Sequence, residues 1–277
     1  MRIAILCTTY NGEKFLSEQI DSIISQTYKD WILYIRDDGS FDKTKEIIQS
    51  YTSKYDNIVL VEDKTLRRGA AMGFMSLLHE VDSKYYMFCD QDDLWLDNKL
   101  ELMSQKMSEV ENEFPHKPIL LHTDLTVVDE HKDVIADSFW DYSGLRDFIL
   151  EKYLPVNNYV TGCTIMMNKE AKKVSFPLSS RLIMHDHWIP LKVSYAGGKI
   201  ISLPEKLNLY RQHSSNTLGA REFKRSISKK ITEIARVCSV NKSLYYQFKD
   251  ACGGDILSFM KLKIAIQKVY TKNNLIK

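Results

Sequence analysis

Four short polar clusters hold the residue types that could do chemistry in this chain. They are Thr8-Thr9-Tyr10-Asn11-Gly12, Asp37-Asp38-Gly39-Ser40, Asp90-Gln91-Asp92-Asp93 and Met184-His185-Asp186-His187-Trp188. Each alone has an ordinary explanation as a turn or as the start of a helix. All four, however, follow segments that are expected to be strands, and ligands of parallel sheets bind beyond the carboxyl ends of the strands. We therefore expect the four clusters to line one crevice.

The third cluster has the spacing of a metal site. Asp90 and Asp92 are separated by one residue, so an extended turn can direct both carboxylates at one ion. Oxygen-only ligands favour Mg²⁺ or Mn²⁺, and Mg²⁺ commonly joins one or two carboxylates to substrate phosphates. The sequence thus predicts a divalent metal and a diphosphate-bearing substrate. It contains neither GxxxxGK[ST] nor GxGxxG after the first strand, which argues against a P-loop and a dinucleotide site.

The elements that must position these clusters alternate along the first part of the chain. Apolar runs predict strands at 3–7, 31–35, 58–61 and 85–89, and helical spacing predicts helices at 14–26, 43–55 and 70–81. This alternation predicts an α/β fold with a mostly parallel central sheet and helices on both faces. Further strands are expected at 119–122, 125–128, 159–167, 199–203 and 207–210, with a helix at 189–196 and only helices after Gly219.

Composition excludes several classes of protein. The 277 residues are 44% hydrophobic and 27% charged, unlike a disordered chain, a collagen-like fibre or a small disulfide scaffold. The net charge of +2 gives no reason to expect a nucleic-acid partner. No apolar run approaches the ~20 residues of a membrane span, and the apolar N-terminal stretch is too short for a signal peptide. We expect a cytoplasmic protein with free thiols at its five scattered cysteines.

The charge is concentrated at the C-terminal end. Residues 217–277 contain 13 basic and 4 acidic residues, so this segment carries +9 and the remainder carries −7. Apolar residues at helical spacing run from Ile256 to Val269 with lysines among them. Two interpretations stay open: a helix peripheral to an anionic membrane surface, and a terminal helix packed on the domain with solvated lysines.

Together the motifs resemble the family-2 glycosyltransferases of GT-A fold, which transfer sugars from nucleotide donors with inversion. The resemblance covers residues 1 to about 219: the first cluster matches the nucleotide-binding loop, residues 37–44 match a DDGSxDxT block, and residues 90–92 match a DxD metal motif. It implies the following roles: nucleotide binding for Thr8, Tyr10, Asn11, Asp38 and Asp90, binding of Mg²⁺ or Mn²⁺ for Asp92 and Asp90, and general base for Asp186.

A closer resemblance concerns the donor. His122-Thr123-Asp124-Leu125, Val160-Thr161-Gly162 and Tyr210-Arg211-Gln212-His213-Ser214-Ser215-Asn216 resemble bacterial rhamnosyltransferases of cell-wall and capsular polysaccharide synthesis. This implies dTDP-L-rhamnose as donor and a saccharide acceptor, commonly lipid-linked at the inner face of the cytoplasmic membrane. The chain departs from the family at 67–73, where an arginine and a glycine replace the usual asparagines. Arg67 or Arg68 then either supplies positive charge to the donor or belongs to a solvated turn.

Four further residues are expected around the base and the metal. His185 flanks Asp186 and is expected to orient it or to contact a sugar, and Gly162 is expected at the sugar. Trp188 is a candidate wall for the sugar ring. His213, in a polar loop after the last strand, is a candidate contact for the metal or the diphosphate.

The expected organisation is a GT-A domain at 1–218 followed by a basic helical extension at 219–277. The domain divides into a nucleotide-binding half, about 1–100, and an acceptor-binding half, about 101–218. Three other functions stay open. They are a metal-dependent phosphoester hydrolase that adds His185, Asp186 and His187 to Asp90 and Asp92, a non-catalytic sugar-binding module, and a transferase that uses a UDP-hexose.

Overall fold

The computed structural model of the chain describes residues 2–62, 68–145, 151–213 and 231–272, with the backbone alone at 231–238 and 270–272. Its strands are β1 (Ile3–Thr9), β2 (Trp31–Asp37), β3 (Ile58–Leu60), β4 (Tyr85–Cys89), β5 (Leu94–Trp95), β6 (Ile119–Val128), β7 (Val134–Ala136), β8 (Met166–Asn168) and β9 (Lys199–Arg211). Its helices are α1 (Leu16–Ile24), α2 (Thr44–Thr52), α3 (Gly69–Glu80), α4 (Lys99–Glu113), α5 (Phe139–Tyr142), α6 (Lys169–Val174), α7 (His185–Tyr195), α8 (Ile231–Cys252) and α9 (Ile256–Lys272), with 3-10 turns η2 (Glu151–Tyr153) and η3 (Gly162–Thr164).

The strands form one sheet, in the order β3-β2-β1-β4-β8-β6-β9-β5, with β7 paired to β6. The long ladders, of β1 with β2 and β4 and of β6 with β9, are parallel, and so is the three-residue pairing of β2 with β3. The antiparallel pairs of β4 and β6 with β8, of β5 with β9 and of β6 with β7 extend over only two or three residues each. The expected α/β fold with a mostly parallel sheet is confirmed.

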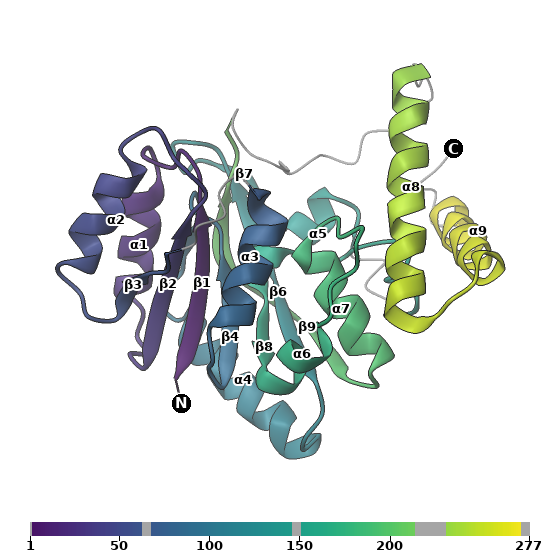
Figure 1. Ribbon diagram of the computed structural model, residues 1–277, viewed down its shortest axis with the longest axis horizontal. Helices are drawn as coiled ribbons and strands as arrows, with labels where there is room; N and C mark the ends of the chain where they lie inside the picture. Colours follow the sequence, from purple (N-terminus) through teal and green to yellow (C-terminus); the bar gives the residue numbers. More distant parts are fainter. Residues whose placement is uncertain (1, 63–67, 146–150, 214–230, 273–277) are drawn as a thin grey trace.

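Helices cover both faces of the sheet (Figure 1). Successive residues of a strand point to opposite faces, so Ile3 and Ile5 of β1 pack under α1, α2 and α4, whereas Ala4 and Leu6 pack under α3, α6 and α7. The same division holds for β4, where Tyr85 and Met87 lie on the first face and Tyr86 on the second. Two apolar cores therefore fix the sheet, and the carboxyl ends of β1, β2 and β4 are left together at one edge.

Three expectations about the middle of the chain need correction. The strands expected at 119–122 and 125–128 are one strand, β6, whose pairing with β9 shifts register at Thr123–Thr126. The strands expected at 199–203 and 207–210 are likewise one strand, β9, because the register shift accommodates Pro204. The strand expected at 159–167 is instead a loop, the turn η3 and the short β8. The fourth polar cluster consequently follows a loop and opens α7 directly.

The C-terminal helices lie at the outer edge of the molecule, with α8 beside α7 and α9 beyond it (Figure 1). Gln247 and Phe248 of α8 are buried, and Ser179 donates a hydrogen bond of 2.6 Å to Asp250. The domain boundary expected at 218/219 lies outside the described residues. Helix α8 packs on the domain through α7. None of the described helices is long and apolar enough to cross a bilayer.

Candidate functional site

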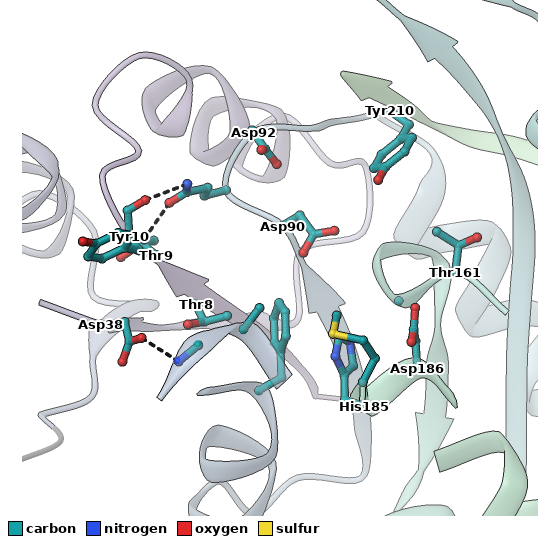
Figure 2. A pocket seen from close by; sticks show the side chains of 16 residues that line it. Thr8, Thr9, Tyr10, Asp38, Asp90, Asp92, Thr161, His185, Asp186 and Tyr210 are labelled. Atoms are coloured by element: carbon teal, nitrogen blue, oxygen red, sulfur yellow. Dashed lines mark hydrogen bonds between the residues drawn. The ribbon is translucent and has the colours of Figure 1, made fainter. Parts of the chain in front are cut away.

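A cavity of about 480 Å³ opens at the carboxyl ends of β1 and β4. The first, third and fourth polar clusters each contribute several lining residues, and the second cluster contributes Asp38. The predicted site residues that line it are Thr8, Tyr10, Asp38, Asp90, Asp92, Gly162, His185 and Asp186 (Figure 2). Asn11, Trp188 and His213 are not among its lining residues. The common crevice inferred from the four clusters is therefore present.

Asp90 stands at the end of β4 and faces the cavity. Burial, together with the charges of Asp92 and Asp186, raises the pKa of its carboxyl group to about 7. Within the described part of the chain no hydrogen bond donor reaches this carboxylate. A carboxylate that is half-buried, beside two others and without a donor, is a fitting ligand for a hard divalent cation.

Asp92 is held by two residues at the end of β9, His213 and Arg211. His213 Nε2 lies 2.9 Å from Asp92 Oδ2, and the His213 ring packs on Phe15 with 4.8 Å between centroids. The buried Arg211 guanidinium donates to the Asp92 carbonyl at 3.0 Å and pairs with Glu18. His213 is thus beside the predicted metal ligands, although it contacts Asp92 rather than the cavity. The expected contact of His213 with the metal or the diphosphate stays a prediction.

A buried polar cluster lies behind the DxD residues. Ligand atoms of Asp90, Asp93 and Cys163 all lie within 4.8 Å of one another. Burial raises the pKa of both Asp93 and Cys163 well above their usual values, and neither residue lines the cavity. Since a protonated thiol is a poor ligand for Mg²⁺ or Mn²⁺, we keep Asp90 and Asp92 as the candidate pair.

The cation beneath this cluster is Lys99. Its side chain is completely buried, donates 2.7 Å hydrogen bonds to the Cys163 carbonyl and to Asn208 Oδ1, and lies 3.7 Å above the Trp95 ring. Burial lowers the pKa of Lys99 to about 8, against the opposing charges of Asp93 and Asp90. Nothing in the sequence distinguished this lysine from a solvated one at a helix start.

Asp186 is the second residue of α7 and faces Asp90 across the cavity (Figure 2). Burial raises the pKa of its carboxyl group to about 7, while the backbone N–H groups of Gly162 and His187 act in the opposite direction. Gly162 must be a glycine here, because a Cβ would lie 2.7 Å from His185 Nε2. A carboxyl group poised near neutral pH is suited to accept a proton.

His185 is buried between two aromatic rings. Its centroid lies 4.4 Å from that of Phe74 and 4.7 Å from that of Phe88, and neither ring nitrogen has a hydrogen-bond partner in the described structure. Burial lowers its pKa to about 3, so the imidazole is neutral at physiological pH. The residue lines the cavity with both ring nitrogens buried, so its contact with a sugar stays a prediction, and nothing places it in hydrogen-bond contact with Asp186.

The opposite end of the cavity contains Asp38. Its carboxylate accepts 2.8 Å from Arg36 Nη1, 3.0 Å from the Arg68 N–H and 2.9 Å from the Gly69 N–H. Burial by itself raises the pKa of Asp38, but these donors lower it below its usual value. Arg68 points its guanidinium at Ser76 Oγ, 2.9 Å away, and Arg67 lies outside the described residues. Arg36, a charged residue at the end of an apolar strand, was a signal that the sequence analysis missed.

The first polar cluster is held by its neighbours. The Tyr10 N–H donates to Gln91 Oε1 at 2.9 Å, and Gln91 Nε2 donates back to the Tyr10 carbonyl at 3.1 Å (Figure 2). Asn11 has a positive φ of 48° and accepts from the Phe41 N–H at 2.9 Å, away from the cavity. We therefore correct its expected role: Asn11 shapes the loop, and Thr8 and Tyr10 line the cavity.

Two further expectations are not met by the structure. Trp188 is 1% exposed, packs in the core with Ile189 and Leu191, and donates from Nε1 to the Ser175 carbonyl, so it forms no wall for a sugar. His187 turns its Nε2 to the Leu154 carbonyl at 2.6 Å and its Nδ1 to Gln247. Of the residues of α7, only the first two, His185 and Asp186, line the cavity, and the turn of the helix directs His187 and Trp188 into the core. The mixed Asp/His metal site of a hydrolase therefore lacks one of its histidines.

Comparison with known proteins identifies the domain. Residues 4–174 match the family model for glycosyl transferase family 2. The chain belongs to this family. The glycosyl transferase family 2 model ends before α7, so the helix that carries Asp186 lies beyond the matched segment.

Several relatives share part of this family 2 sequence. The putative glycosyltransferase EpsE of Bacillus subtilis is 39% identical over 101 residues, 36% of each chain. The dTDP-rhamnosyl transferase RfbG of Shigella flexneri is 36% identical over 97 residues, 34% of each chain. The UDP-Glc:alpha-D-GlcNAc-diphosphoundecaprenol beta-1,3-glucosyltransferase WfgD of Escherichia coli is 30% identical over 105 residues, 38% of this chain and 40% of WfgD. The matched segments thus span about a third to two fifths of these relatives.

Solved structures share the fold along nearly the whole chain. S. aureus TarS 1–349, in complex with UDP-GlcNAc, superposes with a TM-score of 0.64 at 15% identity and covers 98% of this chain and 73% of that one. The mannosyltransferase PcManGT of Pyrobaculum calidifontis, in complex with GDP-Man and Mn²⁺, gives a TM-score of 0.60 at 18% identity and covers 97% and 69%. At these identities the likeness establishes the GT-A fold of this family 2 protein.

Proposed function

We propose that the chain is a glycosyltransferase that moves a sugar from a nucleotide diphosphate to a hydroxyl group of a saccharide acceptor, with inversion at the anomeric carbon. The observation that carries this proposal is the position of Asp186. Its carboxyl group, with a pKa raised to about 7, lines the same cavity as the nucleotide-side Asp38 and the metal-side Asp90. One cavity therefore provides a donor site and, across from it, a proton acceptor. A module that only binds a sugar would not need a proton acceptor.

The reaction follows from this arrangement. The acceptor hydroxyl lies at Asp186, which takes its proton as the oxygen attacks the anomeric carbon. The bond from that carbon to the diphosphate breaks in the same displacement, so the anomeric configuration inverts and no covalent intermediate forms with the protein. The absence of a Cβ at Gly162 leaves room for the ring of His185, which we expect to hydrogen-bond a sugar hydroxyl group.

Asp90 and Asp92 would hold Mg²⁺ or Mn²⁺ next to the diphosphate. When bound, such a metal acts as a Lewis acid for the charge that develops on the leaving group. The donor-free carboxylate of Asp90 supports this assignment, and PcManGT, which shares the fold, was crystallised with Mn²⁺. His213 and Arg211 keep Asp92 in position for that role.

For the donor we propose dTDP-L-rhamnose, and for the acceptor a lipid-linked saccharide of a surface polysaccharide. The similarity to RfbG, named a dTDP-rhamnosyl transferase, supports the donor. WfgD, whose name gives a UDP-Glc donor and a diphosphoundecaprenol-linked acceptor, supports the acceptor class and keeps a UDP-hexose as the competing donor. Such an acceptor would place the protein at the inner face of the cytoplasmic membrane.

A donor screen tests the proposal. The purified full chain, with Mn²⁺ and a mixture of lipid-linked and soluble saccharides, is incubated with dTDP-L-rhamnose, UDP-glucose, UDP-GlcNAc and GDP-mannose. Release of free nucleotide and the shift in melting temperature are measured for each donor. We expect dTDP-L-rhamnose to give the largest effect. Preference for a UDP-hexose would replace the donor and retain the transferase, whereas acceptor-independent release of sugar would indicate a hydrolase.

A further inference from the structure

Helix α9 has a second face that the fold does not cover. Phe259 and Ile266 are buried against α8, with Leu262 and Val269 partly buried beside them. Rotation by about 100° per residue places another set of apolar residues on a different face of the helix. These are Ile256, Met260 and Ile264, which are 49%, 49% and 54% exposed, together with Leu257, which is 70% exposed. This set is named the α9 strip below.

Lysines border the α9 strip. The helix contains four lysines and no acidic residue. Lys261 and Lys268 are exposed and follow the strip on one side at helical spacing. On the other side lies Lys263, half-buried, with Nζ 5.9 Å from the centroid of the Phe259 ring. An apolar strip between cationic borders is the pattern of a helix that lies flat in a membrane interface.

We propose that the α9 strip docks on an anionic membrane surface, with its apolar side chains at the acyl boundary and Lys261 and Lys268 at the lipid phosphates. The lysines of α9 favour an anionic membrane over a second copy of the chain as the partner of the strip. Two strips packed against each other would bring lysine borders together, and α9 offers no carboxylate to neutralise them. Anionic headgroups supply the missing negative charge, at a gain of roughly fivefold in binding for each lysine near the surface.

The position of the helix agrees with this role. Figure 1 shows α9 at the outer edge of the molecule, separated from α7 by α8. The strip therefore does not close the catalytic cavity, and membrane contact leaves the cavity free. The benefit to catalysis rests on the proposed function, because only a lipid-linked acceptor requires an enzyme to stay at the bilayer. Docking of the α9 strip on the membrane does not depend on the proposed function.

Co-sedimentation of the full chain with vesicles tests the proposal. The probes are vesicles of phosphatidylcholine alone and vesicles with about one third phosphatidylglycerol, each at low and at 1 M salt. One variant removes apolar area, Leu257→Gln with Ile264→Gln, and a second removes charge, Lys261→Gln with Lys268→Gln. The matched control, Lys29→Gln with Lys54→Gln, removes the same charge from exposed lysines in the loops that follow α1 and α2. Melting temperature and release of nucleotide with a soluble acceptor are recorded for all.

We expect the wild type and the control to sediment with anionic vesicles at low salt and to be released at 1 M salt, where surface charge is screened within ~3 Å. The charge variant should bind about 30-fold more weakly, from two lysines at roughly fivefold each, and the apolar variant at least tenfold more weakly. Activity on the soluble acceptor should be unchanged in every variant, which separates this proposal from the proposed function. Absence of wild-type sedimentation at low salt would overturn it. So would equal binding by all variants, or a dimer in solution that only the apolar variant dissociates.

Discussion

His213 Nε2 and Asp92 Oδ2 lie 2.9 Å apart although 121 residues separate them in the chain. The contact joins the end of the last strand to the DxD turn after β4. One oxygen of Asp92 is thereby engaged by the imidazole, and the charge of the Asp92 carboxylate acts on Asp90. The histidine thus orients a carboxylate that we expect to bind metal, as second-shell partners of metal ligands commonly do.

Replacement of His213 by alanine should weaken metal binding without abolishing it. We expect a 10–100-fold loss of Mn²⁺ affinity, the usual effect of removing an orienting partner. Asp92→Asn should lose more, and EDTA should inactivate the wild type reversibly. Activity titrated with Mn²⁺ measures all three. Asp97→Asn, an exposed carboxylate on the same segment, is the control and should behave as wild type. Full activity in EDTA would refute the metal role.

Replacement of Asp186 by asparagine should remove the proton acceptor and preserve the cavity. We expect the turnover number to fall by ~10²–10⁴, with little change in donor affinity. The pKa of Asp186 is raised to about 7, so the carboxyl group is protonated and inactive below that pH. The wild-type rate should therefore rise with pH up to about 7 and level off above it. Near-wild-type turnover by Asp186→Asn at saturating substrates would assign the base to another residue.

The His185→Phe variant isolates hydrogen bonding from packing. A phenyl ring keeps the stacking on Phe74 and Phe88 and loses both ring nitrogens. We expect about a tenfold loss in kcat/KM, the value of one hydrogen bond, with the melting temperature maintained. Because burial lowers the pKa of His185 to about 3, this loss should be the same at pH 6 and pH 8. The exposed His131 provides the control, His131→Phe. Unchanged kcat/KM in His185→Phe would show that the imidazole touches no substrate.

Lys99→Met should destabilise the fold strongly. The substitution leaves Asn208 Oδ1 without the Lys99 donor, removes one of the two donors to the Cys163 carbonyl and removes the positive charge beneath Asp93. Loss of one partner from a buried charged cluster costs about 3–5 kcal/mol. Urea denaturation at pH 7 measures the difference, with Lys106→Met on the exposed side of α4 as control. A difference below about 0.5 kcal/mol, the range of neutral surface changes, would contradict this account.

Gln247 connects the C-terminal helices to the catalytic segment. Its Oε1 accepts from the Ile183 N–H at 3.1 Å, and its Nε2 lies 3.4 Å from His187 Nδ1, on either side of Asp186. Gln247→Ala should leave two buried polar groups unpaired, at about 1–3 kcal/mol, and should lower the turnover number more than donor affinity. Melting temperature and steady-state kinetics measure both, with the exposed Gln49→Ala as control. An unaffected turnover number would limit Gln247 to packing.

The sequence predicted the fold well from β1 to β4 and poorly from residue 119 onward, for a physical reason. From β1 to β4, strands and helices alternate and each strand ends in a polar cluster, so local patterns correspond to position in the sheet. From residue 119 onward, β6 and β9 are long and bulged, and η3 replaces an expected strand. Those features depend on register between distant segments, which periodicity within one segment does not contain.

The errors at individual site residues have the same origin. Trp188 and Asn11 were assigned by their neighbours in the sequence, but α7 rotates Trp188 into the core and a positive φ turns Asn11 away. Lys99 and Gln247 were not assigned at all. Their partners, Asn208 and Ile183, lie far from them in the chain and carry no local signature. The positions of these residues are set by contacts between segments that lie far apart in the chain.

The two hydrogen bonds of Gln247 also bear on the order in which the protein is made. Domains emerge from the ribosome and begin to fold from their N-terminal end. The sheet from β1 to β4 has its full set of parallel partners once the first ninety residues have been synthesised. The segment around Asp186 obtains its last buried partners only when α8 has been translated. A nascent chain can thus pair β1 to β4 early, whereas the segment around Asp186, the proposed base, obtains these partners only after α8 has been made.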